Sequence, residues 1–102
     1  MIHVIATIEI AQGRRDDFLT EFHQIIPLVR DEEGCLDYGP TVDVETNLEA
    51  QPEAREDVVT IVERWKSLEH LEAHLVASHM IEYRGRVKDI VSKAVLRILE
   101  PA

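Results

Sequence analysis

The sequence predicts an α+β fold of the ferredoxin-like, split βαβ type, in one domain spanning residues 1–102. Alternating apolar residues mark the strands, and apolar residues at helical spacing mark two amphipathic helices. The elements follow the order strand-helix-strand, strand-helix-strand. Right-handed crossovers would place both helices on one face of a four-stranded antiparallel sheet. A chain of 102 residues is long enough to bury one modest core.

The first half of the chain is predicted to form a strand, a helix and a second strand. Ile2 to Ile10 alternates with the period of a strand. Arg14 to Arg30 carries an apolar helical stripe, in which an internal proline should kink the helix or end its regular part early. Gly34 fits a helix C-cap. Cys35 to Glu45 is predicted as an edge or bulged strand because it contains a Gly-Pro pair, and Thr46 to Asp57 as a long exposed loop.

The second half repeats this order. Val58 to Trp65 is a clear strand, and Ser67 is a plausible N-cap for the helix that follows. This helix is predicted over residues 68–91, loosening near Ser78. Ala94 to Leu99 is the last strand.

One face of the predicted sheet has no helix over it. Every predicted strand carries apolar residues on both faces, so this face would expose apolar surface. We expect a second copy of the chain to cover it, in a homodimer that packs sheet against sheet.

Charge and composition narrow the range of partners. The formal net charge of −9 repels nucleic-acid backbones and anionic lipid surfaces, so we expect neither nucleic acid nor membrane as a partner. No stretch approaches the roughly 18 apolar residues of a membrane span, and the N-terminal residues do not resemble a signal peptide. The single cysteine cannot form an internal disulfide, which fits a cytoplasmic location.

Three of the five histidines fall in the stretch WKSLEHLEAHLVASH, beside the only tryptophan. His70 and His74 are four residues apart on one helix face, a spacing that can bind a transition metal. In a zinc-protease motif, however, the glutamate directly follows the first histidine, whereas here Glu72 stands two places after His70. No nearby cysteine completes a zinc set. We therefore predict no metal site, and we predict that His70 is solvated.

His74 and His79 are the candidate catalytic residues. His74 borders the apolar stripe, where a partly buried imidazole facing the sheet can titrate near neutral pH and move protons. The alternative for His74 is a core histidine bonded to a carbonyl group. His79 lies where the helix loosens, beside a possible cavity mouth, and its alternative is a helix C-terminal residue favoured by the helix dipole.

Trp65 and Glu63 are candidate substrate-binding residues on one face of the third strand. Trp65 is either an aromatic wall for a planar ligand or a core residue. Glu63 needs a partner on a mostly apolar face. That partner could be Arg97 across the sheet or a residue of a second subunit, and the alternative is a catalytic role.

Tyr38, Tyr83 and Arg84 complete the candidate set. Tyr38 offers a phenolic donor, and the other two could close a pocket from the second helix; the alternative for all three is a surface or rim position. Cys35 has no basic neighbour in sequence that would activate its thiol. No Gly-rich phosphate loop, Ser-His-Asp spacing or dinucleotide fingerprint is present.

The runs GCLDY (34–38), VERW (62–65) and SLEHLEAHLVASHM (67–80) resemble the antibiotic biosynthesis monooxygenase family. That family includes quinol monooxygenase-like proteins and belongs to the dimeric α/β-barrel superfamily. The resemblance covers essentially the whole chain. It implies a homodimeric barrel of ferredoxin-like subunits with a pocket between helices and sheet. Some members oxygenate polycyclic or quinol-type aromatics without metal or flavin, so the resemblance implies no cofactor.

On this resemblance we expect a cofactor-independent monooxygenase that uses dioxygen on a small aromatic or quinol-type substrate. His74 or His79 would act as base or donor, Trp65 as a wall and Tyr38 as a hydrogen-bond donor. Two alternatives stay open: an isomerase or proton-transfer enzyme acting on a small carbonyl compound, and a non-catalytic ligand-binding module. A haem-degrading branch of the same fold is disfavoured, because the first strand lacks its asparagine and the second helix its tryptophan.

Overall fold

The structure, a computed structural model, describes residues 1–102 and contains four strands and three helices. In chain order these are β1 (Ile2–Ile10), α1 (Arg15–Arg30), β2 (Cys35–Thr41), β3 (Val58–Trp65), α2 (Leu68–Leu75), α3 (Ser78–Val87) and β4 (Val91–Leu99). The predicted ferredoxin-like α+β fold is confirmed, with the second predicted helix divided into α2 and α3.

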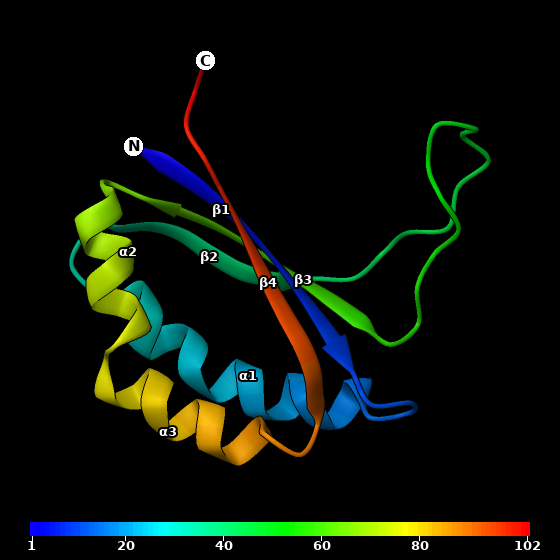
Figure 1. The fold of residues 1–102 in the computed structure, drawn as a ribbon, viewed down its shortest axis with the longest axis horizontal. Helices are drawn as coiled ribbons and strands as arrows, with labels where there is room; N and C mark the ends of the chain where they lie inside the picture. The colour runs from blue at the N-terminus through cyan, green and yellow to red at the C-terminus, as the bar shows by residue number, and fades with distance from the viewer.

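The strands form one antiparallel sheet in the order β2-β3-β1-β4. Its register pairs Val4 of β1 with Glu63 of β3 on one side and with Ile98 of β4 on the other. The chain ends lie close together, as Figure 1 shows, because His3 pairs with Leu99. Because the strand order begins with β2 and ends with β4, these two are the edge strands.

All three helices lie on one side of the sheet (Figure 1). Alternate strand residues face them and are buried, among them Val4, Ala6, Ile8, Val59, Ile61 and Trp65. The opposite face, which carries Ile5, Thr7, Val62 and Val95 at paired positions, has no helix over it. Val62 and Val95 there are 38% and 42% exposed.

Aromatic rings join α1 to the sheet and to α3. Phe18 and Phe22 stand one turn apart on α1 and stack at a centroid distance of 5.8 Å. Phe22 also stacks on Tyr38 of β2 at 5.5 Å and meets Tyr83 of α3 edge-on at 5.8 Å. These contacts fix the relative positions of α1, β2 and α3.

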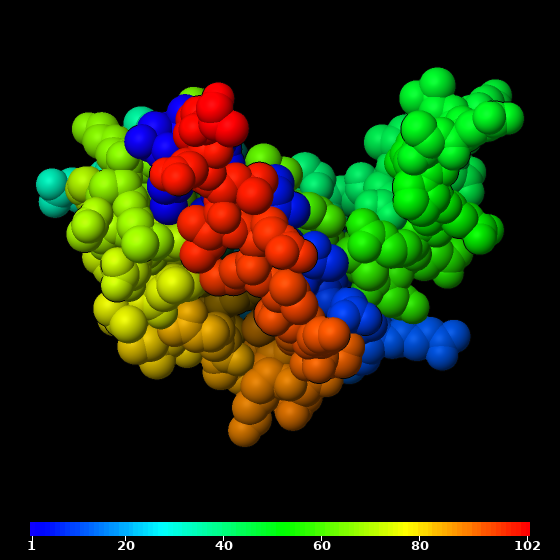
Figure 2. Space-filling model, turned by 45° about the horizontal axis from the view of Figure 1, so that its top comes forward, coloured from blue at the N-terminus to red at the C-terminus, as the bar shows by residue number.

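β2 is shorter than predicted and ends at Thr41 instead of Glu45. It is an edge strand, as its Gly-Pro pair indicates, but the register shift lies between Cys35 and Asp37 rather than at that pair. Residues 42–57 form a loop that projects away from the rest of the molecule (Figures 1 and 2). Its two arms are joined by the ion pair between Asp43 and Arg55, at 2.8 Å.

α1 continues through Pro27 to Arg30, so the prediction of an early helix end is wrong. Pro27 has no N–H donor, but its carbonyl oxygen still accepts a hydrogen bond from the backbone N–H of Asp31. Asp31 is the C-cap residue of the helix. Gly34 is therefore not the cap of this helix. It adopts a φ of +80° in the turn to β2, where any side chain would overlap the ring of His70.

Ser67 caps α2 as predicted, its Oγ accepting a hydrogen bond from His70 N at 3.3 Å. The helix breaks at Val76 and Ala77, slightly before the predicted position, and α3 ends at Val87. Val91, predicted as helical, is the first residue of β4. None of the helices combines the length and the apolarity needed to cross a bilayer.

Candidate functional site

A cavity of about 380 Å³ lies between the sheet and the helices, and most of its lining is apolar. It is lined by five of the seven residues predicted for the site, and Trp65 and His79 are absent from the lining. These five are Tyr38, Glu63, His74, Tyr83 and Arg84. The volume is within the range of about 300–1,000 Å³ that is typical of small-molecule sites.

His74 is the central polar residue of this cavity. α2 places it next to Leu71 on the buried face, and only 1% of its surface is exposed. Its Nδ1 lies 2.8 Å from Glu32 Oε2, so the partner is a carboxylate and not the carbonyl group considered above. Because an ionised carboxylate only accepts, Nδ1 carries the hydrogen, and a neutral His74 has its lone pair on Nε2.

Glu32 holds a second histidine through the same oxygen atom. His79 Nε2 lies 2.8 Å from Glu32 Oε2, and the side chain of His79 is 22% exposed. His79 lies in the first turn of α3, so the alternative of a helix C-terminal position is wrong. One carboxylate after α1 thus connects the end of α2 with the start of α3.

Sequence reasoning missed Glu32. It belongs to the acidic run Asp31-Glu32-Glu33 between α1 and β2, where no periodicity distinguishes one carboxylate from its neighbours. Only the packing of the α2–α3 break over this turn brings it to the histidines. No sequence signal that we recognise could have selected it.

Trp65 stands behind His74, outside the cavity. It is fully buried, and its ring centroid lies 4.7 Å from that of His74. Its Nε1–H donates a hydrogen bond to Glu63 Oε1 at 2.9 Å. Trp65 therefore orients two residues of the cavity wall.

Glu63 faces the helices and is 5% exposed. Arg97 lies on the opposite face of the sheet, because it pairs with Ile5 whereas Glu63 pairs with Val4. The predicted partner Arg97 is therefore wrong, and within the chain Glu63 is bonded to Trp65 instead. Burial raises the pKa of Glu63 to about 7. The hydrogen bond from Trp65 opposes this rise, and the nearby charge of Glu32 adds to it.

Tyr38 and Tyr83 are buried, at 2% and 7% exposure, so their alternative positions on the surface or rim are wrong. Burial is the main cause that raises the pKa of each phenol above its ordinary value. Both therefore remain protonated at neutral pH and can donate hydrogen bonds. Tyr38 meets the His74 ring edge-on at a centroid distance of 5.4 Å.

Burial also lowers the pKa of His74, and the nearby charges of His79 and Arg84 act in the same direction. The hydrogen bond and charge of Glu32 oppose this shift without cancelling it. His74 is therefore neutral at pH 7, the form in which Nε2 can accept a proton.

Four polar side-chain groups on buried residues of this cavity have no hydrogen-bond partner within the chain. They are the hydroxyls of Tyr38 and Tyr83, Glu63 Oε2 and His74 Nε2. Every side-chain nitrogen or oxygen atom that is fully shielded from solvent has a hydrogen-bond partner. These four unpaired groups are therefore not fully shielded and can reach a ligand or water. An apolar cavity with several free donors and acceptors has the features of a binding site for a small, partly polar molecule.

The other candidate residues lie outside the cavity. His70 is not simply solvated, because its Nδ1 lies 2.6 Å from Ser67 Oγ and its side chain is 30% exposed. Burial is the largest cause that raises the pKa of the Cys35 thiol, which disfavours a nucleophilic thiolate. No group of three or more His, Cys, Asp or Glu side chains has the arrangement of a metal site.

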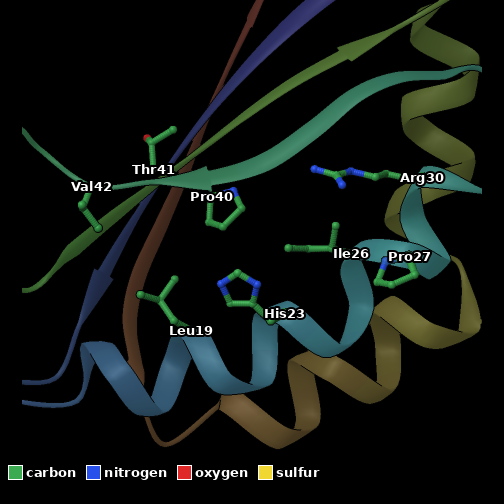
Figure 3. A pocket seen from close by; sticks show the side chains of 8 residues that line it. All are labelled: Leu19, His23, Ile26, Pro27, Arg30, Pro40, Thr41 and Val42. Atoms are coloured by element: carbon green, nitrogen blue, oxygen red, sulfur yellow. The ribbon is translucent and has the colours of Figure 1, made fainter.

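A larger hollow of about 540 Å³ lies between α1 and the end of β2 (Figure 3). His23 and Ile26 extend toward Pro40 across it, and Arg30 lies at one end. Both charged or titratable lining residues, His23 and Arg30, are exposed. Arg30 already donates two hydrogen bonds to the carbonyl oxygen of Tyr38, at 3.1 and 3.0 Å. The buried polar groups are in the smaller cavity, which we therefore take as the candidate site.

Comparison with known proteins finds relatives of similar sequence and structures of similar fold. The Escherichia coli K12 protein named "Probable quinol monooxygenase YgiN" is 41% identical over 103 residues, which cover 99% of this chain and 98% of that protein. Among solved structures, a conserved protein of Methanosarcina mazei Go1 superposes with a TM-score of 0.82 at 22% identity, covering 99% of this chain and 92% of the other. PA3566 from Pseudomonas aeruginosa superposes with a TM-score of 0.80 at 21% identity, with coverages of 99% and 93%. At these identities the solved structures establish the fold alone.

The match to a family profile is the last of these findings. Residues 1–86 match the profile described as antibiotic biosynthesis monooxygenase. This span runs from β1 to the end of α3 except for its last residue, and it includes Glu32 and all seven residues predicted for the site. It is followed by the cavity-lining residues Val87, Lys88, Val91, Ala94 and Leu96. Together with the 41% identity to YgiN, it supports a monooxygenase-like function. The chain belongs to the antibiotic biosynthesis monooxygenase family.

Proposed function

We propose that the protein is a cofactor-independent monooxygenase that uses dioxygen on a small quinol-type aromatic substrate. The observation that carries this proposal is the pairing of His74 with Glu32 at the wall of an apolar cavity, which leaves Nε2 free. Family membership and the name of the YgiN relative support the same class of reaction.

The proposed reaction begins with proton transfer. A substrate hydroxyl gives its proton to His74 Nε2, and the resulting imidazolium is stabilised by the Glu32 carboxylate on Nδ1. The electron-rich phenolate then passes electrons to dioxygen. One oxygen atom enters the ring, the other leaves as water, and all the electrons come from the substrate, which becomes a hydroxyquinone.

The cavity would stabilise the anionic substrate through neutral donors. Tyr38 and Tyr83 keep their protons at neutral pH because burial raises their pKa values. A nearby phenolate would favour the protonated form of Glu63, whose pKa is already about 7. The apolar walls exclude water that would otherwise solvate the phenolate.

His79 has a different part in this scheme. It shares Glu32 with His74 but does not line the cavity. We therefore assign proton transfer to His74, and to His79 and Glu32 the positioning of its ring. Trp65 supports the same ring from behind.

The test is oxygen consumption with a panel of hydroquinones, together with incorporation of ¹⁸O from labelled dioxygen into the product. His74→Ala should lower kcat by about 10²–10⁴-fold, the usual contribution of a general base. Glu32→Gln, which keeps the shape of the side chain but loses its charge, should shift the acidic limb of the pH profile to lower pH. His23→Ala, an exposed histidine on α1, is the matched control and should behave as wild type.

Two results would contradict the proposal. One is the absence of oxygen uptake with every quinol tested. The other is full activity in His74→Ala, provided that the variant is folded by circular dichroism. Turnover that continues without oxygen would instead favour proton-transfer chemistry on a carbonyl compound, for which Glu63, with a pKa of about 7, is a suitable acid or base.

A further inference from the structure

The cavity opens to solvent between α3 and the edge strand β4. Its deep residues, among them Tyr38, Glu63 and His74, are buried. Its exposed lining residues all belong to α3 or its cap and to β4: Arg84, Lys88, Ala94 and Leu96. Figure 2 shows the surface hollowed where the orange-red strand passes the yellow-to-orange helix. This opening is the route by which a ligand reaches His74.

Positive charge is concentrated at this opening, in a chain whose net charge is −9. Arg84 and Lys88 are four residues apart, so they lie on the same side of α3. No carboxylate lines the mouth, and the only acidic residue of the cavity lining is the buried Glu63. The net charge of the chain thus does not describe the potential that a ligand meets here.

These two cations are not used in ion pairs within the chain. Arg86, their neighbour on α3, pairs with Glu21 at 2.9 Å. Arg84 instead donates to the carbonyl oxygen of Leu75, which fixes its guanidinium at the opening. Its charge also acts on groups inside: it adds to the burial that lowers the pKa of His74, and it opposes the burial that raises the pKa of Tyr83. Lys88 makes no hydrogen bond or ion pair, so its ammonium group is available to a ligand.

We propose that Arg84 and Lys88 recognise a carboxylate on the substrate, so that the preferred substrate is an aromatic acid. Its ring would occupy the apolar cavity with the reacting hydroxyl near His74, and its carboxylate would lie at the mouth between the two cations. Guanidinium and ammonium groups are well suited to bind a carboxylate in this way. This inference rests on the proposed function only in naming a hydroxyl as the reacting group; the recognition of the carboxylate is independent of it.

Binding of two redox-inert probes tests the inference without any oxidation. The probes are 2-naphthoate and 2-naphthalenemethanol, which share their ring system and differ in charge. Isothermal titration calorimetry at low salt should show that wild-type protein binds the naphthoate about five to ten times more tightly, as expected for two partly exposed cations. The preference should shrink at 0.5 M NaCl, where the Debye length is only about 4 Å.

Lys88→Met keeps an apolar stem without the charge and should reduce this preference about threefold, while Lys88→Glu should abolish it. Lys66→Met removes an exposed lysine that does not line the cavity, and the preference should be unchanged. Equal affinity of wild-type protein for the two probes, no binding of either, or a preference that survives in Lys88→Glu would overturn the inference. A clear preference for the naphthoate in a protein that oxidises no quinol would instead leave this inference intact and remove the proposed function.

Discussion

Glu63 is a carboxyl group buried among apolar side chains, with the Trp65 indole as its one hydrogen-bond donor. Its pKa in the folded protein, about 7, lies above the ordinary value of 4.5. The stability that this group contributes is therefore fully present below pH 4.5 and is lost as the pH rises through 7. Since one pKa unit corresponds to ~1.4 kcal/mol, the loss amounts to about 3 kcal/mol.

Replacing Glu63 with Gln should remove this loss. We expect Glu63→Gln to exceed wild type in free energy of unfolding by about 2–3 kcal/mol at pH 8, and to show little difference at pH 4.5. Urea titrations at the two pH values measure this directly. Glu72→Gln, on the exposed side of α2, controls for the loss of one charge. The interpretation of Glu63 fails if the two variants have the same pH dependence.

Gly34 lies close to the His70 ring at the start of α2. Its φ of +80° and the overlap that any Cβ would make with the His70 ring both disfavour a side chain. Gly34→Ala should cost about 2–4 kcal/mol in free energy of unfolding. Gly13→Ala is a matched control, since Gly13 has a φ of +77° and no atom within 4 Å of the added Cβ. It should cost only about 1 kcal/mol. Equal losses in thermal or urea unfolding would refute the steric part of the argument.

Among single residues, the sequence pattern located the buried His74 but not its hydrogen-bond partner Glu32. Helical spacing placed His74 beside the apolar stripe because that stripe is a local property of one helix. Glu32 was missed because its role depends on a contact across 42 residues of sequence. The burial of Tyr38 and Tyr83 was missed for the same reason, since it depends on Phe22 of a third element.

Among the elements, the break between α2 and α3 has the largest effect on the site. It turns the chain at Val76 and Ala77, so that His74 and His79 meet at one carboxylate although they lie on different helices. The sequence indicated a loosening near Ser78, one or two residues after the observed break, because the end of an apolar stripe defines a helix boundary only approximately. The strands at residues 2–10 and 58–65 were predicted with their observed bounds because they are runs rich in β-branched and apolar residues that end at turn-forming or polar residues.

Ala77 is the N-cap residue of α3 and provides no side-chain acceptor. Its φ of −62° and ψ of 144° are in the extended region that a capping serine adopts. Ala77→Ser should therefore raise the free energy of unfolding by about 0.5–1 kcal/mol. Ala73→Ser, in the interior of α2 and exposed, should lower it by about 0.5 kcal/mol. Urea denaturation distinguishes the two, and a loss in both would show that Ala77 does not act as a cap.

For the molecule as a whole, the uncovered sheet face remains the basis for predicting a homodimer. The centre of that face is formed by Ile5, Thr7, Val62 and Val95, with charged residues such as Arg64 and Arg97 toward its edges. An apolar centre with a charged rim is the usual arrangement of a protein interface.

Val62→Lys should convert the dimer to a monomer, because it places a charge at the centre of the apolar patch. Val76→Lys changes an even more exposed valine, at 71%, on the helical side and should leave assembly unchanged. Sedimentation velocity measures both variants and the wild-type protein. A wild-type monomer at micromolar concentration, or a Val62→Lys dimer, would contradict the prediction.

The contact between the rings of Trp65 and His74, which are tilted by 35°, gives the protein an internal optical reporter. The chain has a single tryptophan, and its indole lies 4.7 Å from the imidazole and is hydrogen-bonded to Glu63. The emission of an indole responds to charges in its immediate surroundings. Fluorescence of the unlabelled protein should therefore follow protonation of the imidazole and the arrival of a compound in the adjoining chamber, without a dye, a tag or turnover.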